Sequence, residues 1–283
     1  GESWEVVDRP EAQSVVRGGD EAGLTLRELI DAHTAEVMGP DWPRDRVFPI
    51  LVKWLDCRER LSLQVHPPAS IAPMLGGEPK TENWYVAHAA PGAAVLAGLK
   101  EGVDANRFRA ALEDNSAESL LLRHETRAGD SILIHSGVMH AIDAGNVILE
   151  IQQNSDTTYR VYDWGRVGLD GKPRQMHVEQ SLASLTANRA GAPVLLRDDG
   201  ASGVLAECAE FTIRRVRVPA GGRLEFAAGE QVRLLSVVEG ELCERQGGVV
   251  ARGSTVLLPY AGAFSFAATE NATVLVTENF SRI

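Results

Sequence analysis

The sequence has few cysteines, and none of them stand at a spacing that suggests a shared role. Cys57, Cys208 and Cys243 are odd in number and widely separated, and they form no CxxC motif. This pattern argues against the disulfide framework of a small secreted protein and indicates a reducing compartment. We therefore expect a cytoplasmic protein whose cysteines are plain buried thiols.

Long apolar runs are also lacking. No run approaches the roughly 20 residues of a membrane-spanning helix, and no signal peptide is visible. The first residue is Gly1 rather than Met, so the sequence leaves open whether a native N-terminal segment is missing.

Positive charge is in deficit, since 28 Lys and Arg residues face 39 Asp and Glu residues for a net charge of -11. Such a charge argues against a general nucleic-acid binder and against a protein that binds anionic membranes. It does not exclude an anionic small ligand, because a local pocket of Lys and Arg acts at short range. The oligomeric state is not indicated by the sequence.

What the sequence does contain is a hydrophobic fraction of 44%, spread over many short segments of a 283-residue chain. This length suits one large domain or two of ordinary size. Helical patterns are few; in one of them Thr25 is followed three residues later by Glu28, as in a capping box. The expected helices span 25–33, 104–112 and 178–185, and the clearest expected strands span 47–55, 84–89, 93–99, 131–135, 147–153, 210–218, 222–226, 231–239, 240–245, 254–259 and 273–279.

Short strands at this spacing indicate a sandwich or a barrel. The polar stretch 181–199 is the expected linker between two all-β units, 1–185 and 195–283. In each unit a Gly-Asp or Gly-Ser turn, four strand residues and a second turn lead to one residue, His140 in the first unit and Phe264 in the second. This repeat predicts two cupin-type jelly-roll (double-stranded β-helix) barrels with a few short helices. Because the second copy has lost every metal-ligand type, we expect a catalytic metal-binding domain first and a degenerate cupin-like domain after it.

Four polar residues of the first unit form a candidate metal site. Gln64 and His66 stand two residues apart, so on a β-strand their side chains point to the same face. Glu82 and His140 add a carboxylate and a second imidazole. Such donors suit a borderline divalent ion such as zinc. The alternative is that these are scattered polar residues at strand ends.

Four segments, taken together and in this order, resemble one family. They are similar to the zinc-dependent mannose-6-phosphate isomerases of the cupin superfamily, and closest to the short bacterial form. The resemblance covers most of the chain and is densest over 53–177. The segments are VKWL at 52–55, SLQVHP at 62–67, KTENWY at 80–85 and EIQQNSDTTYRVYDW at 150–164.

The resemblance implies a metal-dependent aldose–ketose isomerase that interconverts mannose 6-phosphate and fructose 6-phosphate by enediol proton transfer. It implies one Zn²⁺ ion per chain, with the ligands Gln64, His66, Glu82 and His140. It implies catalytic roles for Arg160, Glu150 and Lys80, and substrate-binding roles for Ser62, Lys53 and Arg160.

The chain departs from the family pattern in places. His135 stands where cupins usually have a proline before the turn at Gly137, and the run 164–166 is less acidic than in short bacterial members. The chain also has no room for the helical insertion domain of the larger members.

Several residue roles stay open at this stage. Arg160 could stabilise an enediolate or hold phosphate, or it could be a buried arginine paired with Asp163 or Asp156. Glu150 could be the base, or it could orient a zinc-bound histidine. Lys80 competes with it as a proton carrier, or pairs with a substrate phosphate or hydroxyl.

Phosphate binding and the aromatic residues are less determined. The basic residues available for a phosphate dianion are Lys53, Arg160, Arg166, Lys172 and Arg174. His177 could be a capping, core or functional residue. Trp54, Trp84 and Trp164 could line a sugar pocket, but core packing is the interpretation we favour.

Two other functions remain as alternatives. A cupin with an amide or carboxylate and two histidines can also bind iron and activate oxygen. A non-catalytic sugar-binding cupin with a vestigial metal site is the other. The 150–163 segment resembles the isomerases rather than such oxygenases, and the first barrel has kept every ligand type.

Overall fold

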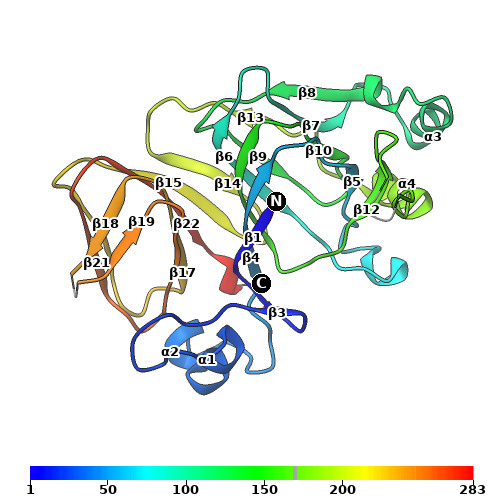
Figure 1. Cartoon of the computed structure of the whole chain (residues 1–283). Coiled ribbons are helices and arrows are strands. Elements are labelled where there is room, and N and C mark those ends of the chain that lie inside the picture. The colour runs from blue at the N-terminus through cyan, green and yellow to red at the C-terminus, as the bar shows by residue number, and fades with distance from the viewer. Residues whose placement is uncertain (168–170, 246, 283) are drawn as a thin grey trace. The chain divides into compact units, whose positions relative to one another are not determined.

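The computed structural model describes residues 1–167, 171–245 and 247–282. Its contacts divide the chain into two compact units (Figure 1). The first unit comprises 1–3 and 53–198, and the second unit comprises 4–52 and 199–283. No helix in the described ranges is long and apolar enough to cross a membrane.

Two antiparallel sheets contain the strands that lie wholly or partly in the first unit. One has the order β1-β4-β11-β6-β9-β13 and the other β12-β5-β10-β7-β8. The strands are β1 (Glu2–Val6), β4 (Ile50–Cys57), β5 (Leu63–Val65), β6 (Glu82–Ala89), β7 (Ala94–Leu99), β8 (Leu121–Glu125), β9 (Ser131–Ile134), β10 (His140–Ile142), β11 (Asn146–Gln153), β12 (Tyr159–Tyr162) and β13 (Leu195–Leu196). The helices of this unit are α3 (Ala105–Glu113), α4 (Val178–Ala187) and the short 3-10 turns η1 (Ala72–Leu75) and η2 (Ala117–Leu120).

The second unit has sheets of order β14-β15-β22-β17-β20 and β16-β21-β18-β19, and a small β2-β3 hairpin. Its strands are β2 (Asp8–Arg9), β3 (Ala12–Gln13), β14 (Gly203–Glu207), β15 (Thr212–Val218), β16 (Arg223–Phe226), β17 (Arg233–Glu239), β18 (Glu241–Glu244), β19 (Val249–Ala251), β20 (Thr255–Leu258), β21 (Phe264–Ala268) and β22 (Ala272–Glu278). Its helices are α1 (Leu26–Ala32), α2 (Thr34–Met38) and the turn η3 (Phe280–Arg282).

The three helices that the sequence predicts are present as α1, α3 and α4, and α2 was not predicted. Helix α1 begins after Thr25, whose side chain accepts a hydrogen bond from the backbone of Glu28 while the Glu28 side chain accepts one from the Thr25 backbone, which confirms the capping box. Helix α3 begins after Asp104, which accepts a bond from the backbone N–H of Arg107. Helix α4 has no side-chain cap bond at His177.

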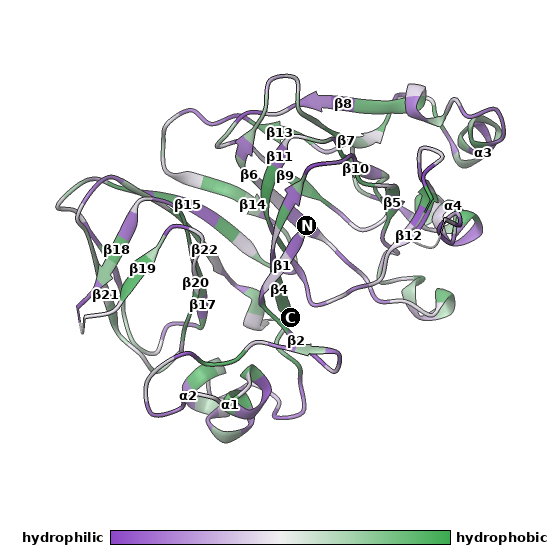
Figure 2. Ribbon diagram, viewed as in Figure 1, coloured by the Kyte–Doolittle hydropathy of each residue, from purple (hydrophilic) through white to green (hydrophobic). Residues whose placement is uncertain are grey.

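The core of the first barrel lies between its two sheets, and the alternation of side chains decides what faces it. Val95 and Ala97 belong to a buried cluster that also contains Trp84 and Ile148 from the other sheet. Leu96, between them in sequence, belongs instead to the cluster packed against α3 and α4. Both faces of this sheet are therefore covered, and alternate residues of its strands face the barrel interior. Figure 2 shows hydrophobic residues along β4, as expected for a strand with six of its eight residues buried.

The division of contacts differs from the predicted boundaries at the N-terminal end. Residues 4–52 belong with 199–283, whereas we predicted 1–185 as one unit. The ring of Phe48 packs edge-on against Phe280 at 5.4 Å, and such a contact leaves no local signature in the sequence. That the two predicted ranges are a catalytic and a degenerate domain stays a prediction.

The stretch 181–199 is not a free linker. Helix α4 continues to Ala187, and Leu195 of β13 pairs with Ile132 of β9. The contact boundary lies only after Asp198. The polar composition that suggested a linker includes Ser181 and Ser184, which are fully buried in ordered structure.

Candidate metal and active site

Three side chains from separate strands meet inside the first barrel. One ligand atom from each of His66, Glu82 and His140 lies within 4.8 Å of the others. Nε2 of His66 is 3.3 Å from Oε2 of Glu82, and Nε2 of His140 is 3.4 Å from Oε1 of the same carboxylate. The three residues are at most 1% exposed. The barrel thus brings two imidazoles and one carboxylate to one buried point.

Backbone carbonyls fix how the two imidazole rings are turned. Nδ1 of His66 lies 2.8 Å from the oxygen of Thr157, and Nδ1 of His140 lies 2.8 Å from the oxygen of Val138. A carbonyl can only accept, so Nδ1 must carry the proton in each ring. The lone pair of each Nε2 then points toward Glu82, which is the orientation of metal-binding histidines.

The protonation states also suit a cation. Burial, aided by the charge of Lys80, lowers the pKa of His66 to about 4, and burial lowers that of His140 as well. For Glu82 burial raises the pKa, but the charges of Lys80 and the two histidines outweigh it and hold the pKa well below its usual range. At neutral pH the site therefore presents two neutral imidazoles and one carboxylate.

The donor set fits a divalent metal ion. Among the described residues, Nε2 of His66, Nε2 of His140 and Oε1 of Glu82 have no hydrogen-bond partner. Buried polar atoms normally have partners, so three that converge need an explanation. A metal ion coordinated by these atoms supplies one.

Gln64 lies beside this group. It is the residue of β5 directly opposite His140 of β10. Its neighbours Leu63 and Val65 belong to the cluster packed against α3 and α4, so Gln64 faces the barrel interior. The register therefore places Gln64, the predicted fourth ligand, beside His140 and in the barrel interior.

Lys80 connects the metal-site carboxylate to a second carboxylate. Its Nζ is 2.8 Å from Oε2 of Glu82 and 3.2 Å from Oε1 of Glu150. Burial lowers the pKa of Lys80, but the two carboxylates more than reverse this, and the pKa lies above its ordinary value. The other oxygen of Glu150 accepts a hydrogen bond of 3.2 Å from the indole N–H of Trp84. Lys80 is thus held as a cation between two carboxylates.

Arg160 lies on the far side of Gln64. It is directly opposite Gln64 in the pairing of β12 with β5, and its Nε donates a 3.3 Å hydrogen bond to Oγ of Ser62. Burial lowers its pKa, as does the charge of Arg174. The backbone N–H of Arg160 donates to Nδ1 of His177 at 3.3 Å, so His177 supports this strand.

Three of the basic residues predicted as a phosphate set lie near one another, because after burial the charges of Arg174 and Arg166 also lower the pKa of Arg160. Arg166 and Arg174 both form ion pairs with Asp163, at 2.6 and 2.5 Å. Nζ of Lys53 is 3.6 Å from a carboxylate oxygen of Asp156. Asp163 thus pairs with Arg166 and Arg174 rather than with Arg160. Both of these arginines are engaged in structural contacts.

Sequence reasoning missed two supports of the site. Trp84 is fully buried, as the core interpretation requires, yet its N–H also binds Glu150 and its ring meets that of His140 edge-on at 5.4 Å. Thr157 contributes only a backbone oxygen to His66, and a backbone contact carries no residue-type signal. Trp84 could have been found from its spacing, since it is two residues from Glu82 on one strand.

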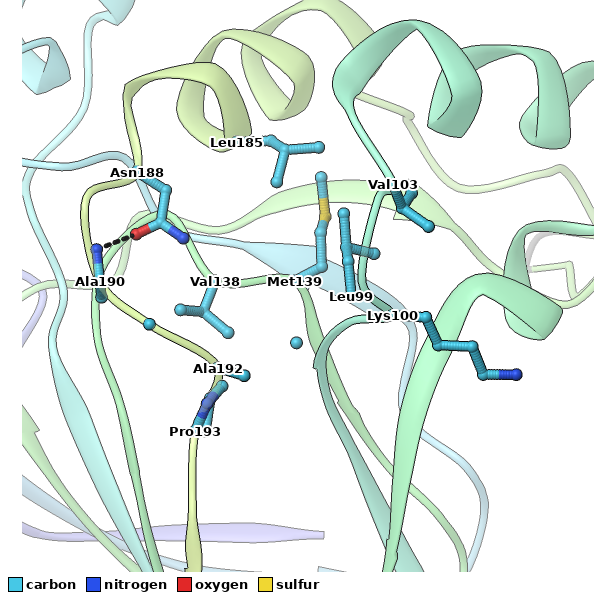
Figure 3. Close-up of a pocket in the computed structure, with 12 residues that line it drawn as sticks. Leu99, Lys100, Val103, Val138, Met139, Leu185, Asn188, Ala190, Ala192 and Pro193 are labelled. Atoms are coloured by element: carbon cyan, nitrogen blue, oxygen red, sulfur yellow. Dashed lines mark hydrogen bonds between the residues drawn. The ribbon is translucent and has the colours of Figure 1, made fainter.

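A cavity of about 180 Å³ lies elsewhere in the first unit and contains none of the predicted site residues (Figure 3). Val138, Met139 and Leu185 line it, and the side chain of Lys100 extends away from its centre. Oδ1 of Asn188 accepts a 2.9 Å hydrogen bond from the backbone N–H of Ala190 at its edge. This cavity stands apart from the group of His66, Glu82 and His140.

No family model matches the chain. Curated relatives do. The chain is 37% identical to the mannose-6-phosphate isomerase of Streptococcus mutans serotype c over 245 residues. This match covers 85% of the chain and 76% of that protein. It is 33% identical to the mannose-6-phosphate isomerase ManA of Bacillus subtilis over 269 residues. This match covers 92% of the chain and 84% of ManA.

Solved structures agree with these relatives. The crystal structure of mannose 6-phosphate isomerase from Bacillus subtilis matches with a TM-score of 0.84 and 28% identity, over 98% of this chain and 89% of that chain. The structure of a putative mannosephosphate isomerase from Archaeoglobus fulgidus matches with a TM-score of 0.76, over 98% of this chain and 87% of that chain, and at 24% identity it attests the fold.

Proposed function

The chain belongs to the mannose-6-phosphate isomerase family, and from this membership we propose that it interconverts mannose 6-phosphate and fructose 6-phosphate with one bound zinc ion. It is an aldose–ketose isomerase. The observation that carries the proposal is the buried group of His66, Glu82 and His140, whose converging atoms lack hydrogen-bond partners within the described ranges.

We assign zinc to these three residues and Gln64. Nitrogen and oxygen donors without thiolate are typical of catalytic zinc sites, which keep a position open for water or substrate. When bound, zinc supplies a Lewis acid that polarises the substrate oxygens. The carbonyls of Thr157 and Val138 hold both imidazoles in the tautomer that such binding needs.

The reaction moves a proton between C1 and C2, so it needs a base near those carbons and a donor near the oxygens. We propose Glu150 as the base, because it is a carboxylate inside the barrel that accepts bonds from Lys80 and Trp84. Lys80, whose pKa is raised, stays protonated and is suited to donate to a substrate oxygen. In the ground state Lys80 also fixes the distance between Glu150 and Glu82.

Substrate binding is assigned to the neighbouring polar residues. Arg160 and Ser62 are hydrogen-bonded to one another and flank Gln64, where the guanidinium can hold a phosphate or an enediolate oxygen. Lys53 is 4% exposed and adds a second positive charge on the interior face of β4. It shares this face with Leu55 of the barrel core, because the two residues stand two apart on the strand. A cytoplasmic location and a role in carbohydrate metabolism complete the proposal.

A coupled assay with mannose 6-phosphate tests the proposal. The protein is measured as purified, after chelator treatment, and after zinc is added back. Activity that chelator removes and zinc restores is the expected result. Absence of activity in protein that holds stoichiometric zinc would contradict it and favour a sugar-binding cupin.

A further inference from the structure

The second barrel repeats the strand order of the first. Sheet order β16-β21-β18-β19 corresponds to β5-β10-β7-β8, and β15-β22-β17-β20 corresponds to β4-β11-β6-β9. Under this correspondence β21 stands where β10 does. Phe264 is the first residue of β21 as His140 is the first residue of β10.

Cross-strand register extends the correspondence to other positions of the metal site. Phe226 of β16 lies opposite Phe264, as Gln64 lies opposite His140. Arg233 begins β17 opposite the last residue of β20, as Glu82 begins β6 opposite the last residue of β9. The second barrel therefore has two phenylalanines and an arginine at the positions of three metal donors.

In the second barrel, an internal cation occupies the position that corresponds to the metal site of the first. The guanidinium carbon of Arg233 lies 5.2 Å from the centroid of the Phe226 ring. Its Nε is 3.2 Å from Glu278 and its Nη2 is 2.7 Å from Glu230. Arg233 is 8% exposed, so a positive charge already fills this point and a metal ion is excluded.

A cavity of about 560 Å³ nevertheless lies at this end of the second barrel. Phe226, Phe264 and Glu244 line it. Glu225 lines it from the other face of β16, because it stands between the core residues Leu224 and Phe226. The volume falls within the range of about 300–1,000 Å³ that is usual for small organic ligands, and barrel mouths are common places for such pockets. The end of the barrel that binds metal in one unit thus remains hollow in the other.

The charges of the lining indicate which ligand it suits. Three carboxylates, Glu225, Glu230 and Glu244, and two guanidinium groups lie at the cavity, namely that of Arg245 in its lining and that of Arg233, which pairs with Glu230. Within the described part of the chain these carboxylates form no convergent group of metal-ligand atoms, so they are spread around the cavity. An anion such as a phosphosugar meets net negative charge, and a compact cation finds no shared point of coordination.

We propose that the second barrel binds an unphosphorylated pyranose sugar in this cavity. Hydroxyl groups distributed around a ring can donate to separate carboxylates and accept from Arg245. The C–H surface of the ring can pack on the half-buried Phe264, while Phe266 supports that side chain by stacking at 6.4 Å. The sugar is a free monosaccharide or the end residue of a glycan, and both present the same ring.

Ligand-observed NMR with the full-length, zinc-loaded protein tests this proposal. The probes are the methyl pyranosides of mannose, glucose and galactose, a disaccharide of the sugar that binds, and spermidine and inorganic phosphate as charged controls. Saturable millimolar binding of at least one neutral pyranoside is expected, and tighter binding of the disaccharide would identify a glycan end as the source.

Variants locate the binding. Glu244→Gln should weaken it several-fold, because Glu244 shares the interior face of Leu242 and lines the cavity. Ala263→Phe, which fills the cavity, should abolish it, and both variants should keep wild-type isomerase activity. Glu270→Gln is the matched control, because Glu270 is exposed and outside the cavity. His140→Ala should also bind normally, which separates this site from the first barrel and from the proposed function. Binding that is lost in His140→Ala, that survives in Ala263→Phe, or that is seen only for spermidine or phosphate would overturn the proposal, as would no binding at all.

Discussion

Nδ1 of His66 lies 2.8 Å from the backbone oxygen of Thr157, although the two residues are 91 positions apart in the sequence. Thr157 is itself held by the loop after η1, because its hydroxyl oxygen accepts a 2.9 Å hydrogen bond from the backbone N–H of Glu78. The orientation of His66, a proposed metal ligand, therefore depends on a loop that contains no proposed ligand.

Gly77→Ala should lower metal affinity without touching a ligand. A Cβ at Gly77 would lie 2.7 Å from Cγ2 of Thr157 and 2.6 Å from the hydroxyl of Tyr159, so Thr157 must shift. Loss of such support for a ligand costs about 10–100-fold in affinity, which competition with a chelator of known affinity measures. Gly191→Ala is the control, since a Cβ there meets nothing within 4 Å. Equal affinities in both variants would show that the loop does not position His66.

Trp84→Phe should reduce turnover while the metal stays bound. The variant keeps a buried ring and removes one of the two side-chain donors to Glu150. A hydrogen bond to a charged group contributes about 1.5–3 kcal/mol, so kcat should fall roughly tenfold or more. The control is Trp42→Phe, because the buried indole N–H of Trp42 has no hydrogen-bond partner in the part of the chain that the structure describes. A wild-type kcat for Trp84→Phe would mean that its N–H does not position Glu150.

Arg160→Ala should reduce kcat by about 100-fold, the usual effect of removing a donor that stabilises developing charge. Metal content, measured by elemental analysis, should be unchanged, because Arg160 binds Ser62 rather than a metal donor. Arg174→Ala serves as the comparison, since Arg174 pairs with Asp163. Near-normal turnover in Arg160→Ala would remove this residue from the mechanism.

His140→Ala and Phe264→Ala form a matched pair, because the two residues begin corresponding strands. The first should abolish stoichiometric metal binding and activity, and the second should leave metal content intact while lowering the melting temperature. Metal retained by His140→Ala, or lost from Phe264→Ala, would show that the ligand assignment or the correspondence between the barrels is wrong.

Low pH should lower the stability of the second unit, because it protonates Glu278. Burial raises the pKa of this carboxyl, but its bonds to Arg214 and Arg233 outweigh burial and hold the pKa below 4.5. The ion pairs therefore contribute fully above pH 4.5, and their contribution is lost as pH falls below that value toward the folded pKa.

Glu278→Gln should cost roughly 2 kcal/mol at neutral pH, since Arg233 keeps Glu230 as a partner. The difference from wild type should shrink as pH falls below 4.5, and urea unfolding at a series of pH values measures it. A difference that is constant across this range would show that the charge of Glu278 is not responsible.

The alternation of strand residues explains why much of the site could be predicted. Lys53, Gln64 and Glu150 each face the barrel interior because their sequence neighbours pack outside it or their second neighbours pack inside. The two-residue period of a strand can be read from the sequence. Together with the family motifs, it predicts that these side chains face the barrel interior.

The remaining features depend on tertiary contacts that have no local pattern. Thr157 acts through a backbone oxygen, and any residue type has one. The backbone N–H of Tyr260 donates a 2.9 Å hydrogen bond to the oxygen of Val37, which joins two distant parts of the chain in one unit. Neither contact could be read from spacing or composition.

The second unit is built from the two ends of the chain, and this has a consequence for synthesis. Residues 4–52 leave the ribosome before the first unit, and their partners in 199–283 leave after it. Domains fold as units as they emerge, so the first unit can be complete while residues 4–52 are still unfolded, with apolar residues such as Phe48 uncovered. A ribosome that stalls after residue 198 would therefore hold a finished first unit, with its proposed metal site, beside an unfolded and aggregation-prone segment 4–52, a species that chaperones would have to retain.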